Sequence, residues 1–85
     1  MFYAYIIQNP KGILYKGSTD NPAKRLEQHN TDNGFPSFTA KRGPWKLIHL
    51  EEFENRKEAE AREKYFKSGS GRRFLKEKLK KHMAG

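Results

Sequence analysis

The chain of 85 residues carries 18 Lys and Arg against 10 Asp and Glu, a formal net charge of +8, and contains no cysteine. This length allows one compact domain with a modest core, and the lack of cysteine excludes a disulfide framework, a zinc ribbon and a thiol nucleophile. The apolar start, residues 2–7, is too short for a signal sequence or a membrane span. We therefore expect a single domain over residues 1–85, soluble, cytoplasmic and without membrane contact.

The positive charge is concentrated in the last third of the chain. Residues 1–55 hold seven bases and six acids, whereas residues 56–85 hold eleven bases and four acids. A surface stripe of this kind attracts polyanions such as nucleic acids. The alternative is a solvated helical face that only keeps the protein in solution.

Two short runs near the start of the chain predict a β-hairpin. Residues 2–7 and 13–18 are rich in β-branched and aromatic side chains, and a turn segment with Pro and Gly separates them. Side chains on one face of a sheet share the same parity along a strand. A register that pairs Tyr5 with Tyr15, which we expect, therefore places the two phenols side by side.

The next segment predicts a short helix over about residues 22–30, with Asn21, or the aspartate before it, as the N-cap. Arg25 and His29 are four residues apart and therefore lie on one face of this helix. The helix has few apolar side chains, so this polar pair is either solvated or directed at a functional group. Residues 31–44 contain Gly, Pro, Ser and Thr and are typical of a surface loop.

The second half of the chain predicts a strand and two helices. The strand covers residues 45–53, and an Asn-x-x-Glu capping box precedes a helix over about residues 56–68. Ser70 is the expected N-cap of the last helix. In the helix over residues 56–68, Glu63 falls within an arc of about 60° together with an alanine and a phenylalanine, so an acid shares the apolar side.

The order and spacing of these polar positions resemble the signature of the GIY-YIG nuclease family, in particular its small stand-alone bacterial members. The resemblance covers almost the whole chain. The first tyrosine triplet lacks the usual glycine, and Lys16 stands where the family name has isoleucine. By strand alternation Lys16 points away from Tyr15, and we interpret it as solvated. The matching positions are Tyr3, Ala4, Tyr5, residues 14–19, Asn21, Arg25, His29 and residues 59–67 with Glu63.

The resemblance implies an α+β fold with a small three-stranded antiparallel sheet flanked by helices, in the order β-β-α-β-α-α. This is also the order of the elements predicted above. It further implies an endonuclease that hydrolyses nucleic-acid phosphodiesters, DNA being favoured, with Mg²⁺ or Mn²⁺, in DNA repair or processing. Glu63 is then the metal ligand, whereas without the resemblance an ion pair of Glu63 with Arg25 or Arg62 is the simpler interpretation.

The other four catalytic candidates have complementary chemistry. The planar guanidinium of Arg25 suits the scissile phosphate. Tyr15 is expected to position or deprotonate the attacking water, with its pKa lowered from about 10 by cationic neighbours, and Tyr5 to orient water or phosphate. His29, with an ordinary pKa of about 6.5, suits either a base or a donor to phosphate, so the general base stays open between His29 and Tyr15.

Several other polar and aromatic residues have structural interpretations. Ser18 and Thr19 are expected to hold the turn into the first helix, although either hydroxyl suits a phosphate contact. Trp45 opens a strand, which favours packing in the core over base stacking. His49 is expected on the surface of the third strand.

Away from the cut, basic side chains are expected to hold the nucleic-acid backbone without reading its sequence. The alternative function is a non-catalytic basic nucleic-acid-binding module on the same scaffold. The oligomeric state stays open, and so does a partner protein that supplies specificity, because a domain this small has no separate recognition module. The candidate backbone contacts are Lys41, Arg42, Lys64, Lys67, Arg72 and Arg73.

Overall fold

The computed structural model describes residues 1–30 and 43–84, the last six of these by their backbone alone. The predicted α+β class and the order β-β-α-β-α-α are both confirmed. The elements in chain order are β1 (Phe2–Gln8), β2 (Leu14–Thr19), α1 (Pro22–His29), β3 (Lys46–Phe53), α2 (Arg56–Lys67) and α3 (Gly69–Ala84).

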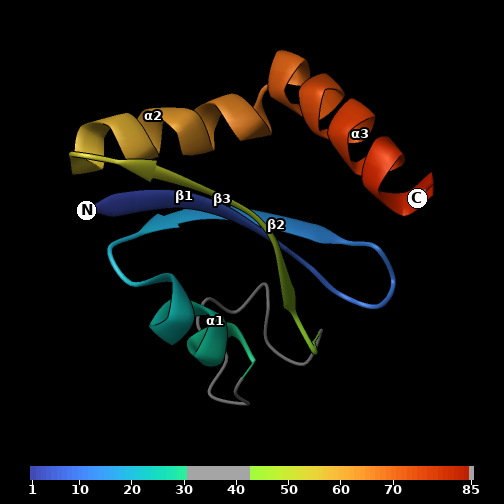
Figure 1. Cartoon of the computed structure of the whole chain (residues 1–85), viewed down its shortest axis with the longest axis horizontal. Coiled ribbons are helices and arrows are strands. Elements are labelled where there is room, and N and C mark those ends of the chain that lie inside the picture. The colour runs from blue at the N-terminus through green and yellow to red at the C-terminus, as the bar shows by residue number, and fades with distance from the viewer. Residues whose placement is uncertain (31–42, 85) are drawn as a thin grey trace.

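The three strands form one antiparallel sheet with the order β2-β1-β3, so β1 is central and β2 lies at an edge. Figure 1 shows α2 and α3 on one face of this sheet and α1 on the other. The layers follow from burial, because each face of the central strand carries apolar side chains that must be covered. None of the helices in the described residues combines the length and the hydropathy that a membrane-spanning helix requires.

The central strand supplies side chains to two separate hydrophobic clusters. Its even-numbered residues pack under α2 and α3, and its odd-numbered residues pack on the side of α1. This alternation is the period-two geometry of a strand that is buried on both faces. The first cluster contains Ala4, Ile6, Phe66 and Leu75, and the second contains Tyr5, Ile7 and Trp45.

The hairpin register differs from the prediction by two residues. Tyr5 lies opposite Gly17, and Tyr15 lies opposite Ile7. The loop is longer than expected because the side chain of Asn9 bonds to it. The amide oxygen Oδ1 of Asn9 accepts hydrogen bonds from the backbone N–H of Lys11 (3.1 Å) and of Ile13 (2.8 Å). A shift of two residues preserves the parity of the strand, so the two tyrosines still share one sheet face.

The helix starts are set by local side-chain caps. As predicted, Asn21 caps α1 by accepting from the N–H of Lys24, and Asn55 caps α2 by accepting from the N–H of Glu58. The predicted cap of the last helix at Ser70 is wrong, because α3 begins at Gly69 and Ser68 Oγ accepts from the N–H of Gly71. The break between α2 and α3 is therefore shorter than the sequence pattern indicated.

Gly71 brings the start of α3 against the last turn of α2. A Cβ atom at Gly71 would overlap the carbonyl oxygen of Tyr65 and lie 2.8 Å from Cα of Phe66, whereas a Cβ at Gly69 has no heavy atom within 4 Å. We expect Gly71→Ala to lower the free energy of unfolding by about 1–3 kcal/mol through overpacking. Gly69→Ala should leave it unchanged or raise it by less than about 1 kcal/mol. Urea denaturation of both variants measures the difference, and equal stabilities would contradict this helix contact.

Candidate active site

Three aromatic rings gather on the α1 side of the sheet. The ring centroids of Tyr5 and Tyr15 are 6.4 Å apart, those of Tyr5 and His29 are 5.8 Å apart, and those of Tyr15 and His29 are 4.9 Å apart. Within this group the Tyr5 hydroxyl and His29 Nε2 form a 2.8 Å hydrogen bond. Tyr5 is 3% exposed and His29 is 1% exposed, while Tyr15 is only partly buried. Tyr15 is therefore the member of this ring cluster that faces outward.

Gly17 leaves room for the Tyr5 ring to cross the edge strand. Gly17 lies directly opposite Tyr5, and a Cβ atom there would lie 2.5 Å from the Tyr5 hydroxyl oxygen. Any larger residue would have to displace the ring and with it the hydrogen bond to His29. The glycine of the second signature triplet is thus required by the position of the tyrosine of the first.

His29 and Tyr5 are both neutral near pH 7. Burial, reinforced by the positive charge of Arg25, lowers the pKa of His29 to about 4. Burial, followed by the neighbouring Tyr15, raises the pKa of Tyr5 well above its usual range. The hydrogen bond between Tyr5 and His29 consequently joins two uncharged groups. It fixes the orientation of the Tyr5 hydroxyl and supplies the buried His29 ring with a hydrogen-bond partner.

The lowered pKa of His29 predicts a pH-dependent stability. The unfolded chain has a His29 pKa of about 6.5 and takes up a proton before the folded chain, whose His29 pKa is about 4. The free energy of unfolding should therefore fall, by about 1–2 kcal/mol, as the pH drops from 7.5 to 5. Urea denaturation at the two pH values measures this loss. His29→Gln should remove most of this pH dependence. If the free energy of unfolding of that variant falls with pH as much as that of the wild type, His29 is not the cause.

The expected pKa shift of Tyr15 is in the wrong direction. Lys67 and Arg25 do lower the pKa of this phenol, as predicted from the cationic surroundings. Burial is the larger effect, and the negative charge of Glu63 acts with it, so the pKa of Tyr15 is raised. Tyr15 therefore carries its proton at neutral pH.

Arg25 lies beside the ring cluster. It sits on α1 one turn before His29, is partly buried, and its positive charge acts on the pKa of Tyr5, Tyr15 and His29. The predicted pairing of Arg25 and His29 on one helix face is therefore realised, with that face turned toward the sheet. The cluster of neutral polar rings thus carries one adjacent cation.

Glu63 approaches the same edge strand from the opposite sheet face. One carboxylate oxygen accepts a 2.8 Å hydrogen bond from Ser18 Oγ, and the other accepts a 2.6 Å hydrogen bond from Lys67 Nζ. The Glu63 side chain is 23% exposed, so the carboxylate remains in contact with solvent. Burial is the main cause of the raised pKa of Tyr5 and of Tyr15, and the negative charge of Glu63 acts in the same direction. The predicted residues thus lie on both faces of the sheet, with the three rings and Arg25 on the α1 side and Glu63 on the α2 side.

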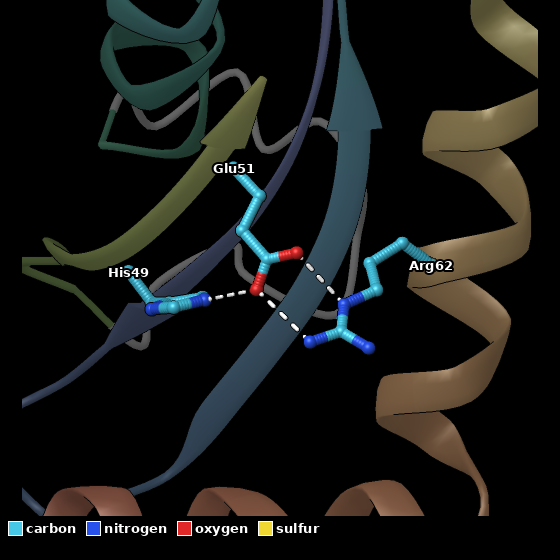
Figure 2. A network of polar contacts seen from close by, with 3 residues as sticks. All are labelled: His49, Glu51 and Arg62. Carbon is cyan, nitrogen blue, oxygen red and sulfur yellow. Dashed lines mark hydrogen bonds and ion pairs between the residues drawn. The ribbon is translucent and has the colours of Figure 1, made fainter. Parts of the chain in front are cut away.

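Arg62 does not pair with Glu63, contrary to one interpretation of the sequence. Figure 2 shows Arg62 directed at Glu51, with Nε and Nη2 at 2.7 and 3.2 Å from the two carboxylate oxygens. His49 Nε2 lies 2.6 Å from the same Glu51 carboxylate, and its side chain is only 10% exposed. The prediction of a surface position for His49 is thus wrong. This network fastens α2 to β3 and leaves Glu63 on the side of α2 that faces β2.

The hydrogen bond between Ser18 and Glu63 was not predicted from the sequence, which indicated a turn or a phosphate contact for Ser18. Thr19 holds the turn into α1 as expected, since its Oγ1 accepts from the N–H of Asn21. Ser18, in contrast, faces α2 because it lies opposite Ala4 of the α2-side cluster. Strand alternation already predicts that Ser18 and Tyr15 point to different faces, but the helix that meets Ser18 is decided by packing.

The donor set suits a hard cation held largely by water and substrate. No group of three or more His, Cys, Asp or Glu side chains occurs together in residues 1–30 and 43–78. Mg²⁺ commonly takes only one or two protein carboxylates and completes its shell with waters and phosphate oxygens. The Glu63 carboxylate, which is partly exposed and bonded to Ser18, fits such a site. For the cation to bind the second carboxylate oxygen, Lys67 would have to break its hydrogen bond to that oxygen.

Four of the six predicted contacts to the nucleic-acid backbone lie on the described helices. Those on α2 and α3 are all exposed, whereas Lys41 and Arg42 lie outside the described residues. Trp45 is 3% exposed and belongs to the α1-side cluster, so its core interpretation is confirmed. The exposed contacts are Lys64, Lys67, Arg72 and Arg73.

The chain is similar to known proteins over most of its length. Residues 1–82 match the family model of the GIY-YIG catalytic domain. A UPF0213 protein of Clostridium perfringens is 45% identical over 67 residues, which cover 79% of this chain and 71% of that protein. A UPF0213 protein of Bacillus licheniformis is 39% identical over 79 residues, covering 89% of this chain and 80% of that protein. No solved structure matches significantly. The family match over nearly the whole length, together with the polar residues gathered at the edge strand, means that this chain belongs to the GIY-YIG family of nuclease domains.

Proposed function

We propose that the chain acts as a single domain over residues 1–85 and is a divalent-metal-dependent endonuclease that hydrolyses phosphodiester bonds in DNA. The observation that carries this proposal is geometric: the rings of Tyr5, Tyr15 and His29 gather on one side of β2, and the Glu63 carboxylate, bonded to Ser18, meets this strand from the other side. One acid, one guanidinium and two phenols at one partly exposed edge match the needs of phosphodiester hydrolysis. These needs are a held cation, charge neutralisation and an oriented water. DNA repair or processing is the setting that we propose.

Arg25 is the residue that we assign to the scissile phosphate. Its fork of donors can contact two non-bridging oxygens and stabilise the negative charge that grows on them in the transition state. The neutral rings of Tyr15 and His29 beside it do not compete with the phosphate for this charge.

Tyr15 is the residue that we assign to the attacking water. It keeps its proton because burial raises its pKa, so its role is to orient the water by hydrogen bonding. Tyr5 and His29 act behind it, because both are almost completely buried and hydrogen bonded to each other. His29 is then a positioning residue for Tyr5, and the ring cluster holds Tyr15 against α1.

Glu63 is the residue that would hold the cation, with Ser18 orienting its carboxylate. A divalent cation supplies neutralisation of phosphate charge and acidification of water in this class of reaction. Mg²⁺ and Mn²⁺ both fit oxygen ligands of this type. The exposed bases of α2 and α3 would hold the flanking nucleic-acid backbone.

Incubation of the purified protein with supercoiled plasmid, branched DNA, single-stranded DNA and RNA tests this proposal. Nicked or shortened products should appear with Mg²⁺ or Mn²⁺ and disappear with EDTA. Salt-sensitive binding without cleavage under every metal condition would instead support a non-catalytic nucleic-acid-binding module. The relative rates on the four substrates would identify the substrate class.

A further inference from the structure

Lys16 occupies an unusual place on the edge strand. It lies opposite Ile6, so it faces α2 and α3, on the side of the sheet opposite to the ring cluster. The residue is partly buried rather than solvated as the sequence indicated. Among the described residues it forms no hydrogen bond or ion pair. A partly buried ammonium group without a counterion costs free energy that a lysine in open solvent would not.

Two further cations lie on the two helices that cover this face of the sheet (Figure 1). Arg72, in the first turn of α3, and Lys67, at the end of α2, are both exposed, and their charges add to burial in lowering the pKa of Lys16. Glu63, which is bonded to Ser18 two residues along the strand from Lys16, has its other carboxylate oxygen bonded to Lys67. Lys67 is therefore paired with Glu63, whereas Lys16 and Arg72 form no ion pair within the described part of the chain.

The backbone adds to this positive potential. The region lies at the N-terminus of α3, a helix of 16 residues, where the helix dipole is positive. Gly69 opens this helix, and a Cβ atom at this position would meet no heavy atom within 4 Å other than those of its chain neighbours and of its own helix backbone. A phosphate group can thus approach these cations without displacing a side chain at Gly69.

We infer that Lys16, Lys67 and Arg72 form a second phosphate subsite, which holds the backbone phosphate next to the one that is cut. Lys16 is two residues from Ser18, the partner of Glu63, which corresponds to about 7 Å along the strand. This distance is close to the spacing of neighbouring phosphates in one nucleic-acid strand. The inference rests on the proposed function, because Glu63 marks the position of the scissile phosphate. It assigns a role to the lysine that replaces isoleucine in the second signature triplet.

Binding of a short labelled DNA duplex in EDTA, followed by fluorescence anisotropy over a range of salt concentrations, tests the subsite without any cleavage. Lys16→Met should weaken binding roughly 5- to 10-fold at low salt and reduce the slope of log affinity against log salt by about one unit. Lys11→Met removes the same charge from the exposed hairpin loop and should change affinity less than about twofold. Equal effects of the two variants, or no DNA binding by the wild type, would overturn the inference.

A thermal-unfolding measurement separates loss of a ligand contact from loss of folding. Lys16→Met should unfold at the same or a higher temperature than the wild type, since it removes an uncompensated charge. Inorganic pyrophosphate should raise the unfolding temperature of the wild type but not that of Lys16→Met. Arg72→Gln, at an exposed position, should repeat the loss of DNA affinity. Absence of cleavage in every assay would contradict the proposed nuclease activity without changing these binding results. Cleavage by the wild type together with unchanged DNA affinity in Lys16→Met would contradict the subsite alone.

Discussion

Glu63→Gln should reduce DNA cleavage by about 10³-fold or more while leaving the fold and the affinity for DNA close to those of the wild type. Glutamine keeps the size of the side chain and an oxygen that accepts from Ser18 Oγ. It lacks the negative charge that a hard cation requires, so the substitution removes the site for the metal. The loss of the partly exposed ion pair with Lys67 should cost little stability.

Single-turnover cleavage with Mn²⁺, circular dichroism and DNA binding in EDTA together measure these effects. Glu60→Gln is the matched control, because Glu60 lies on the same helix and is exposed. It removes the same charge at a distance from β2 and should retain cleavage within about twofold. Equal cleavage by Glu63→Gln and the wild type would remove Glu63 from the active site, whatever the source of the nuclease activity.

Arg25→Ala should lower the rate of cleavage by about 10²- to 10³-fold, with a smaller effect on DNA affinity. The guanidinium lies beside Tyr5, Tyr15 and His29, where its charge is felt by all three rings. An interaction that strengthens as charge develops on the phosphate affects the chemical step more than binding of the ground state. Arg25→Lys should restore only a small part of the rate, since an ammonium group cannot form the bidentate contact.

Rates at saturating DNA and affinities in EDTA distinguish this effect from a general loss of positive charge. Lys24→Ala is the matched control, because Lys24 precedes Arg25 on α1 and is exposed. It should lower affinity slightly and leave the saturated rate unchanged. Equal losses in both variants would mean that Arg25 contributes only to the electrostatic attraction of DNA.

Local features of the fold were predictable because they depend on residues that are close in sequence. The caps at Asn21 and Asn55 use backbone N–H groups three residues ahead of each cap, so the starts of α1 and α2 follow from short motifs. The shared face of Tyr5 and Tyr15 follows from strand parity alone. Their register did not, because the Asn9 side chain widens the hairpin loop by bonding to its backbone.

The contacts that build the site depend instead on segments far apart in the chain. The Tyr5–His29 hydrogen bond spans 24 residues, and the Ser18–Glu63 hydrogen bond spans 45. The identities of these side chains indicated polar chemistry, whereas their partners were fixed only when α1 and α2 packed on opposite faces of the sheet. The family resemblance identified the candidate residues, and the packing of the helices on the sheet determined which of them are in contact.

The sequence by itself determined the order of the elements, the parity of the strands and the types of the chemical groups near the edge strand. Tertiary structure alone decided that Arg62 binds Glu51 rather than Glu63, because consecutive residues on a helix point about 100° apart and only one of them can face β3. It also decided the directions of the pKa shifts of Tyr15 and Lys16. Desolvation depends on which side chains are covered, and no arrangement of charges along the chain specifies that in advance.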